Sequence, residues 1–220
     1  MGRCPSVGAV PSSTDPVPSS TGAVPVVDPA AQPPVRLLLV SGSTRAGSTN
    51  TAVHRTAPAV APEGVTTELY DGLAGLPAFN PDDDHDPLPR PVADLRARLA
   101  ATDAVLFCTP EYAGGLPGSF KNLLDWTVGG AEMYGRPVAW INVSSVAAPT
   151  GGADAHASLA TVLGYVGADV ADAACARVPM TRSAVGPDGL VTDTDVREQL
   201  AGVLRLLARH VRAHGPAARG

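Results

Sequence analysis

The sequence predicts a doubly wound α/β fold on a five-stranded parallel sheet with strand order 2-1-3-4-5. One observation is that short apolar runs alternate along the chain with segments whose apolar residues recur at helical spacing. Another is that three of the runs are followed by small or hydroxylated residues. The carboxyl ends of parallel strands share one edge of a sheet, where ligands bind, so we expect one ligand crevice at that edge.

Composition excludes several classes of protein. The 220 residues carry a net charge of −5 and show no basic run, which argues against a nucleic-acid partner. Cys4, Cys108 and Cys175 lack metal-type spacing, so we expect no metal site and no disulfide framework. We find no apolar stretch of roughly 18 residues and no signal-peptide pattern, and we therefore expect a cytoplasmic protein without a membrane partner.

Residues 1–34 differ in amino-acid composition from the rest of the chain. They are rich in Pro, Ser, Thr, Gly and Ala, and the short motifs G-A-V-P and V-P-S-S-T each occur twice. A segment with so few bulky apolar residues is predicted to be disordered. An anchoring or docking tail, or a start codon assigned too far upstream, would look the same. The folded domain is expected over residues 35–214.

The first strand is expected at residues 35–40 and is followed by S-G-S-T-R-A-G-S-T-N. Hydroxyls, free backbone N–H groups, a helix N-terminus and Arg45 would meet there, which suits a phosphate. The pattern is neither G-x-G-x-x-G nor a P-loop. The alternative is that Ser48, Thr49 and Asn50 simply cap the next helix, expected at 51–60 and shortened by Pro58.

A second strand is expected at 65–70, an acidic loop at 71–87, a helix at 91–101 and a third strand at 103–108. The acidic loop contains D-D-D-H-D, which suggests either a metal site or, as we favour, a solvated loop. The third strand leads into a loop bounded by Pro110 and Pro117, whose glycines would let a flat ligand approach the backbone. The helix that follows carries Trp126, interpreted as core, ligand wall or subunit interface.

The last third continues the alternation. We expect a strand at 137–143, then Ser144 and Ser145, a helix at 153–166 with His156 on its surface, a strand at 168–178 and a final amphipathic helix ending near Val211.

Two segments resemble a known family. G-S-T-R-A-G-S-T-N and T-P-E-Y-A-G-G-L-P-G-S-F-K-N-L-L-D-W are similar to the G-S-x-R-x-G-S-x-N and P-E-Y-N-x-x-x-P-G-x-L-K-N-x-I-D-W of the NAD(P)H-dependent FMN reductases. That flavodoxin-like group includes quinone, azo-dye and chromate reductases. The resemblance spans residues 35–211. Two positions depart from the family pattern: Ala113 replaces an asparagine, and Asp154 stands near a frequent arginine.

The resemblance implies bound FMN, with NADPH or NADH as donor and a quinone, azo compound or free flavin as acceptor. The FMN-binding residues would be Ser43, Arg45, Ser48, Thr49, Asn50 and Thr51 around the phosphate, Pro110, Glu111, Tyr112, Ala113 and Gly114 along the ring, and Ser144 or Ser145. Because flavin N5 carries the chemistry, no side chain is expected to be catalytic, and Glu111 is expected to make a structural or subunit contact. A homodimer or homotetramer is implied, with Leu116, Leu123 and Trp126 offered as its interface.

Two other functions fit the same fold. A flavodoxin-type carrier would pass single electrons to protein partners, and a flavin-free relative would serve as an interaction module. A carrier typically has a strongly acidic rim and aromatic residues around the flavin, whereas this chain is only 4% aromatic.

Overall fold

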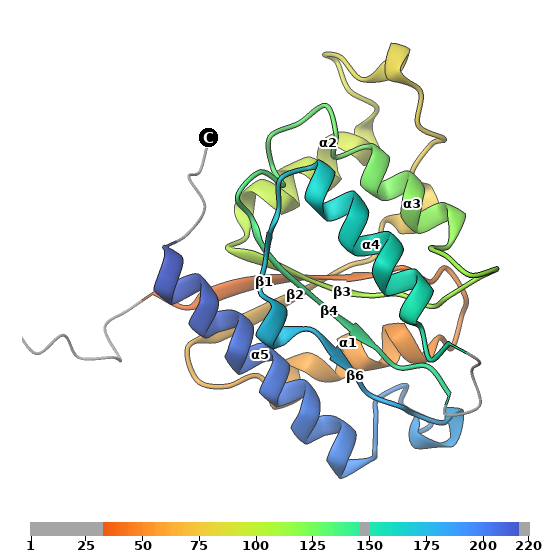
Figure 1. Cartoon of the computed structure of the whole chain (residues 1–220), viewed down its shortest axis with the longest axis vertical. Helices are drawn as coiled ribbons and strands as arrows, with labels where there is room; N and C mark the ends of the chain where they lie inside the picture. Colours follow the sequence, from red (N-terminus) through yellow and green to blue (C-terminus); the bar gives the residue numbers. More distant parts are fainter. Residues whose placement is uncertain (1–32, 146–149, 216–220) are drawn as a thin grey trace, which may run out of the picture. The chain divides into compact units, whose positions relative to one another are not determined.

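A parallel sheet forms the centre of the computed structural model, which describes residues 33–145 and 150–215 (Figure 1). The strand order is β2-β1-β3-β4-β5, with β6 also paired to β4, and every pairing is parallel. The order confirms the predicted doubly wound, flavodoxin-like class. The strands are β1 (Val35–Ser41), β2 (Val65–Tyr70), β3 (Ala104–Cys108), β4 (Pro137–Asn142), β5 (Asp169–Val170) and β6 (Ala176–Arg177).

Helices cover both faces of the sheet (Figure 1). On one face lie α1 (Thr49–Val60) and α5 (Thr194–His214), and on the other α2 (Arg90–Ala101), α3 (Gly118–Asp125) and α4 (Ala153–Tyr165). Successive side chains of a strand point to opposite faces, so in β1 Leu37 and Leu39 pack toward α1 and α5, and Leu38 and Val40 toward the other layer. This double coverage explains why the strands read as continuous apolar runs.

The single strand predicted at residues 168–178 is wrong. The structure divides it into β5 and β6, with a short 3-10 helix, η4 (Asp172–Ala174), between them. Ala171 and Ala174, at the two ends of this break, are both buried, so the break packs small apolar side chains into the core. Both short strands still pair with β4, which keeps the chain on one edge of the sheet.

Helix α1 continues past Pro58 to Val60, so the proline does not shorten it as predicted. Pro58 lies near the end of the helix, where its missing N–H removes one hydrogen bond and Ala57 beside it stays buried. The same helix carries His54, which is fully buried and whose Nε2–H donates to the carbonyl of Val40 at 3.2 Å. Burial lowers the pKa of His54 to about 4.

The interface suggested for Leu123 and Trp126 is also wrong, because both side chains lie in the core. Trp126 is fully buried, donates its indole N–H to the carbonyl of Pro77 at 2.9 Å, and meets Phe79 edge to face. In the acidic loop, Asp84 is not solvated: its carboxylate pairs with Arg96 at 2.6 Å.

The predicted disordered tail lies, apart from its last two residues, outside the described part of the chain. Within the ranges that the structure describes, none of the helices combines the length and the apolar character needed to cross a membrane.

Candidate functional site

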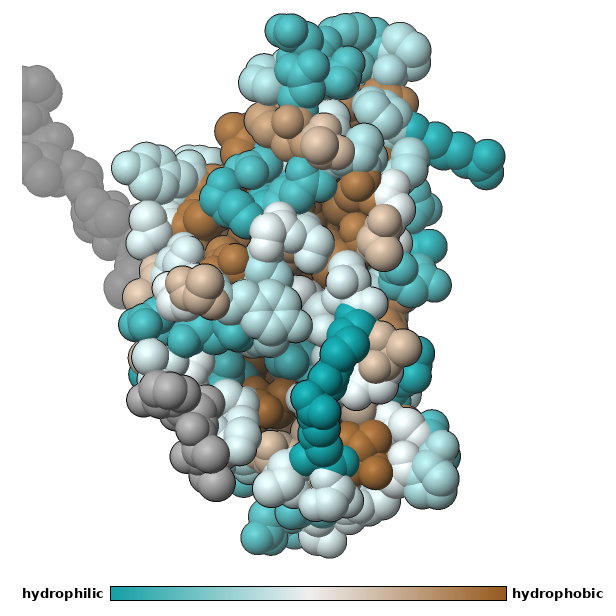
Figure 2. Space-filling view, turned by 90° about the vertical axis from the view of Figure 1, so that its right-hand side faces the viewer, coloured by the Kyte–Doolittle hydropathy of each residue, from teal (hydrophilic) through white to brown (hydrophobic). Residues whose placement is uncertain are grey.

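A cavity of about 540 Å³ opens at the carboxyl edge of the sheet. Figure 2 looks onto this edge, where hydrophilic and intermediate residues surround recesses in which hydrophobic residues are visible. Loops that follow β1, β3, β4 and β6 line the cavity, as the position of the strand ends predicts. The lining residues are Ser43, Arg45, Ser48, Thr49, Asn50, Pro110, Glu111, Tyr112, Asn142, Val143, Ser144, Ser145, Thr150, Gly152, Met180, Thr181 and Arg182.

The loop after β1 is held by its own hydroxyl groups. The backbone N–H of Ser43 donates to Ser41 Oγ, and the N–H of Arg45 donates to Ser43 Oγ, both at 3.4 Å. The Oγ atoms of Ser41 and Thr51 are 2.9 Å apart and join the end of the strand to the helix. Thr51 therefore fixes the loop and does not line the main cavity.

Helix α1 begins inside the cavity. Ser48 occupies the N-cap position, but its side chain makes no capping hydrogen bond. The sequence alternative, in which these residues simply cap the helix, therefore does not describe Ser48. Ser48, Thr49 and Asn50 line the cavity together with Arg45, so the N-terminus of α1, the positive end of the helix dipole, lies at the cavity, an arrangement that favours an anion.

Gly42 allows β1 to approach β3 closely. A Cβ at this position would lie 2.4 Å from Thr109 Oγ1 and 3.0 Å from Phe120 Cγ, and both of these residues are fully buried. Only glycine therefore fits beneath the loop.

The loop after β3 turns sharply at its tip. Tyr112 and Gly115 exchange backbone hydrogen bonds of 3.0 and 3.1 Å, and the two residues between them, Ala113 and Gly114, have φ angles of 49° and 72°. The tip is exposed and lies outside the residues that line the cavity, whereas Pro110, Glu111 and Tyr112 line it. The structure thus separates Ala113 and Gly114 from the other predicted ring contacts.

Glu111 ties this loop to α4. Its carboxylate accepts hydrogen bonds from the hydroxyl of Thr150 and from the backbone N–H groups of Asp154 and Ala155, at 3.1 and 3.2 Å. The hydrogen bond from Thr150, together with those from Ala155 and Asp154, lowers the pKa of Glu111. These contacts are the structural role expected for Glu111, and a carboxylate held in this way is poorly suited to proton transfer.

The end of β4 supplies Asn142, and the loop after it supplies Ser144 and Ser145. The side chain of Asn142 is buried; its Oδ1 accepts from the N–H of Ser144 at 2.9 Å, and its Nδ2 donates to the carbonyl of Thr109 at 3.4 Å. Asn142 therefore links the loops after β3 and β4. A Cβ on Gly152, which has a φ of 85°, would collide with this amide.

A buried thiol contacts Asn50, one of the residues that line the cavity. Cys108 Sγ donates to Asn50 Oδ1 at 3.2 Å, and burial raises the pKa of the thiol far above its usual range. This cysteine is therefore unsuited to act as a nucleophile.

The cavity is also lined by Met180, Thr181 and Arg182, which were not predicted from the sequence. They follow β6, whose alignment continues because Val178 N–H donates to Asn142 O and Met180 N–H to Ser144 O, at 2.7 and 3.1 Å. Ligands bind at the carboxyl ends of parallel strands, and this loop follows such an end as the others do. The sequence prediction nevertheless assigned no binding residues to the loop after the strand expected at 168–178. With Arg182, the lining contains a second guanidinium group in addition to that of Arg45.

The prediction of a surface position for His156 is wrong. The side chain is buried in α4 and packs edge to face on Trp140, with ring centroids 5.7 Å apart. Burial, and secondarily the charge of Arg177, lowers the pKa of His156 to about 4, so the ring is neutral at pH 7.

Comparison with known proteins gives a consistent match. The family model described as NADPH-dependent FMN reductase matches residues 35–180. The chain is 31% identical over 180 residues to an NAD(P)H-dependent FMN reductase of Pseudomonas aeruginosa, covering 81% of this chain and 96% of that protein. It is 29% identical over 174 residues to a quinone reductase of Escherichia coli, and the match covers 77% of this chain and 92% of that protein.

A solved structure agrees with this match. FerB from Paracoccus denitrificans, a flavoenzyme NAD(P)H:(acceptor) oxidoreductase, superposes with a TM-score of 0.71 at 30% identity. The superposition covers 82% of this chain and 99% of FerB.

Proposed function

The chain belongs to the NADPH-dependent FMN reductase family, and on this premise we propose that it binds FMN in the cavity at the carboxyl edge of the sheet. There it would transfer reducing equivalents from NAD(P)H to a small acceptor. The FMN-binding domain would comprise residues 35–214. A volume of about 540 Å³ lies within the range of roughly 300–1,000 Å³ found for small-molecule and cofactor sites.

The observation that carries the proposal is the uncapped N-terminus of α1 inside the cavity. In the proposed complex, the N–H groups of the first turn, Arg45 and the hydroxyls of Ser43, Ser48 and Thr49 hold the phosphate. Orphan N–H groups at a helix start satisfy phosphate oxygens, and the guanidinium adds charge-assisted hydrogen bonds. The donor set therefore fits the phosphate end of FMN.

The ring of FMN would lie between the loops after β3 and β4. Pro110, Glu111 and Tyr112 would line one side and Ser144 and Ser145 the other, because these residues share the cavity with the α1 terminus. When bound, FMN supplies the redox chemistry by accepting a hydride and passing electrons on. The protein's part is to bind, orient and leave one ring face open. The carboxylate of Glu111 is already occupied by α4 and positions the loop.

We infer a reductase and not a flavodoxin-type carrier. Of the described residues that line the cavity, Tyr112 is the only aromatic one, so this part of the lining does not clamp a ring between aromatic faces. Glu111 is the only acidic residue among them, beside two arginines, so the lining also lacks the acidic character of a carrier's rim.

We further propose a quinone as acceptor, because a relative named quinone reductase aligns with this chain over 92% of its own length. A homodimer or homotetramer and a cytoplasmic location also belong to the proposal. The free thiols of Cys108 and Cys175 support a reducing compartment.

An absorbance experiment tests the function. Purified protein is reconstituted with FMN and titrated anaerobically with NADPH and, separately, with NADH. Bleaching of the flavin bands by either nucleotide, and their return on adding a quinone, supports the reductase. Bands that stay oxidised with both nucleotides favour the carrier, and failure to take up FMN overturns the flavin site. Initial rates with a quinone, an azo dye and free FMN then rank the acceptors.

A further inference from the structure

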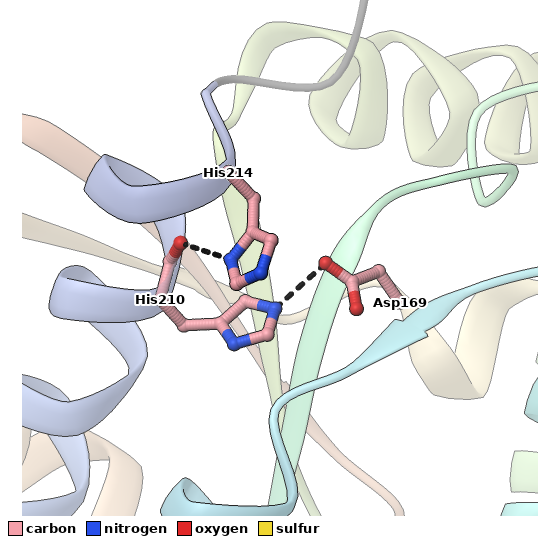
Figure 3. Close-up of side chains that lie close together, drawn as sticks. All are labelled: Asp169, His210 and His214. Carbon is pink, nitrogen blue, oxygen red and sulfur yellow. Dashed lines mark hydrogen bonds and ion pairs between the residues drawn. The ribbon is translucent and has the colours of Figure 1, made fainter.

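Asp169, His210 and His214 lie together (Figure 3). Asp169 begins a strand of the parallel sheet, so the cluster lies at the edge opposite the carboxyl edge that holds the cavity. Asp169 is the first residue of β5, and the two histidines belong to the last turns of α5. From this arrangement we propose that the three side chains bind a divalent transition-metal ion of the zinc class. The site is independent of the proposed FMN cavity and of the reductase activity.

The backbone sets the three side chains side by side. Residues four apart on a helix share a face, so His210 and His214 project in the same direction. Their rings stack with centroids 4.2 Å apart and an interplanar angle of 29°. Asp169 is fixed opposite them because β5 pairs with β4 and the N–H of Asp169 donates to the carbonyl of Arg136 at 2.9 Å.

The hydrogen bonds prepare the ring nitrogens for a metal. Nδ1 of His214 lies 3.0 Å from the carbonyl oxygen of His210. A carbonyl only accepts, so Nδ1 carries the proton and the neutral ring has its lone pair on Nε2. Metal-binding histidines are typically oriented by such a bond to the other nitrogen. Nε2 of His210 already lies 2.6 Å from Asp169 Oδ2, so an ion there would replace a shared proton.

Only a small movement closes the site. One ligand atom from each residue lies within 4.8 Å of the other two. A tetrahedral ion with bonds of about 2.0–2.2 Å holds its ligand atoms about 3.3 Å apart. His214 is exposed and ends α5, so its ring can rotate toward the other two ligands. The carboxylate of Asp169 is about one-third exposed, which leaves room for water to complete the coordination.

The donor set selects the class of ion. Two imidazole nitrogens and one carboxylate oxygen suit Zn²⁺, Co²⁺, Ni²⁺ or Cu²⁺, whereas Mg²⁺ and Ca²⁺ prefer ligand sets made entirely of oxygen. A bound ion would fasten the last turn of α5 to β5 and so stabilise the folded chain against unfolding.

Calorimetric titration of the full-length, tag-free chain with ZnCl₂ tests the site. We expect saturable binding of one ion per chain. At a zinc concentration about a hundredfold above Kd, the melting temperature should rise by roughly 5–10 °C. His210→Ala and His214→Ala should each weaken binding at least about tenfold, because each removes an imidazole ligand of the ion. The control His85→Ala removes an exposed histidine that is not a member of the cluster, and this variant should bind zinc as the parent does.

Two further variants keep the test decisive if a histidine variant folds poorly. Asp169→Asn keeps the shape of the side chain and removes its charge, and His214→Gln changes an exposed residue at the end of a helix. Both should bind zinc more weakly and keep the parent's NAD(P)H oxidation rate. Failure of the parent to bind zinc saturably, or equal binding by all the variants, would overturn the proposal.

Discussion

The carboxylate of Glu111 accepts the hydroxyl hydrogen of Thr150 and two N–H groups of the first turn of α4. The loop after β3 is thereby joined to the residues that follow β4, although 39 positions separate Glu111 from Thr150. One side chain thus connects two walls of the cavity.

Glu111→Gln removes the negative charge at the N-terminus of α4 and should lower the free energy of unfolding by about 0.3–1 kcal/mol at pH 7. The pKa of Glu111 is lowered from 4.5 in the folded state, so its stabilisation is present above that value and is lost as pH falls through the lower folded pKa. Urea midpoints of parent and variant should therefore converge in acid. Asp125→Asn, which breaks only the surface pair with Lys121, is the control. A gap that stays constant with pH would contradict the prediction.

Arg45→Ala tests the phosphate end of the cavity. Losing a charge-assisted hydrogen bond of about 1.5 kcal/mol should weaken FMN binding roughly tenfold. Riboflavin has no phosphate, so its affinity should not change. Quenching of flavin fluorescence measures both affinities. The control Arg205→Ala removes an exposed arginine of α5 that does not line the cavity. Equal weakening of both flavins would place Arg45 near the ring.

Gly42→Ala should destabilise the fold by about 1–3 kcal/mol, the usual result of overpacking. The added Cβ would lie 2.4 Å from Thr109 Oγ1, and neither Thr109 nor Phe120 has space to move away. Gly118→Ala is the matched control, because its Cβ would have no neighbour within 4 Å and α3 gains a better helix former. Denaturant unfolding should show a loss for the first variant and no loss for the second.

His54 should make stability depend on pH between 6.5 and about 4. The unfolded chain binds this proton below 6.5 and the folded chain only below about 4, so stability is full above 6.5 and falls through that window, by up to about 3 kcal/mol. His54→Gln can still donate to Val40 O but does not titrate there, so it should remove the share of the pH dependence that His54 contributes and leave the share of His156, whose pKa is also lowered to about 4. His85→Gln, at an exposed position, should leave it unchanged.

Much of the candidate site could be predicted from the sequence, because ligands bind at the carboxyl ends of parallel strands. Ser43, Arg45 and Tyr112 follow apolar runs and line the same cavity. The split between β5 and β6 could not be predicted, because no glycine or proline interrupts residues 168–178, and Arg182 was missed with it. The burial of His156 could have been predicted from the sequence, because His156 lies three residues before Leu159 and therefore on the buried face of α4. The positive φ of Ala113, by contrast, has no signal in its residue type.

The break between β5 and β6 also affects how folded chains meet one another. A long, flat edge strand presents a row of free N–H and C=O groups that can template pairing with another molecule and lead to aggregation. Here that edge consists of two strands of two residues each, with η4 turning the backbone between them. The edge beside β4 is therefore a poor template for adding a further strand. Copies of this chain would associate there through side chains and not by extending the sheet.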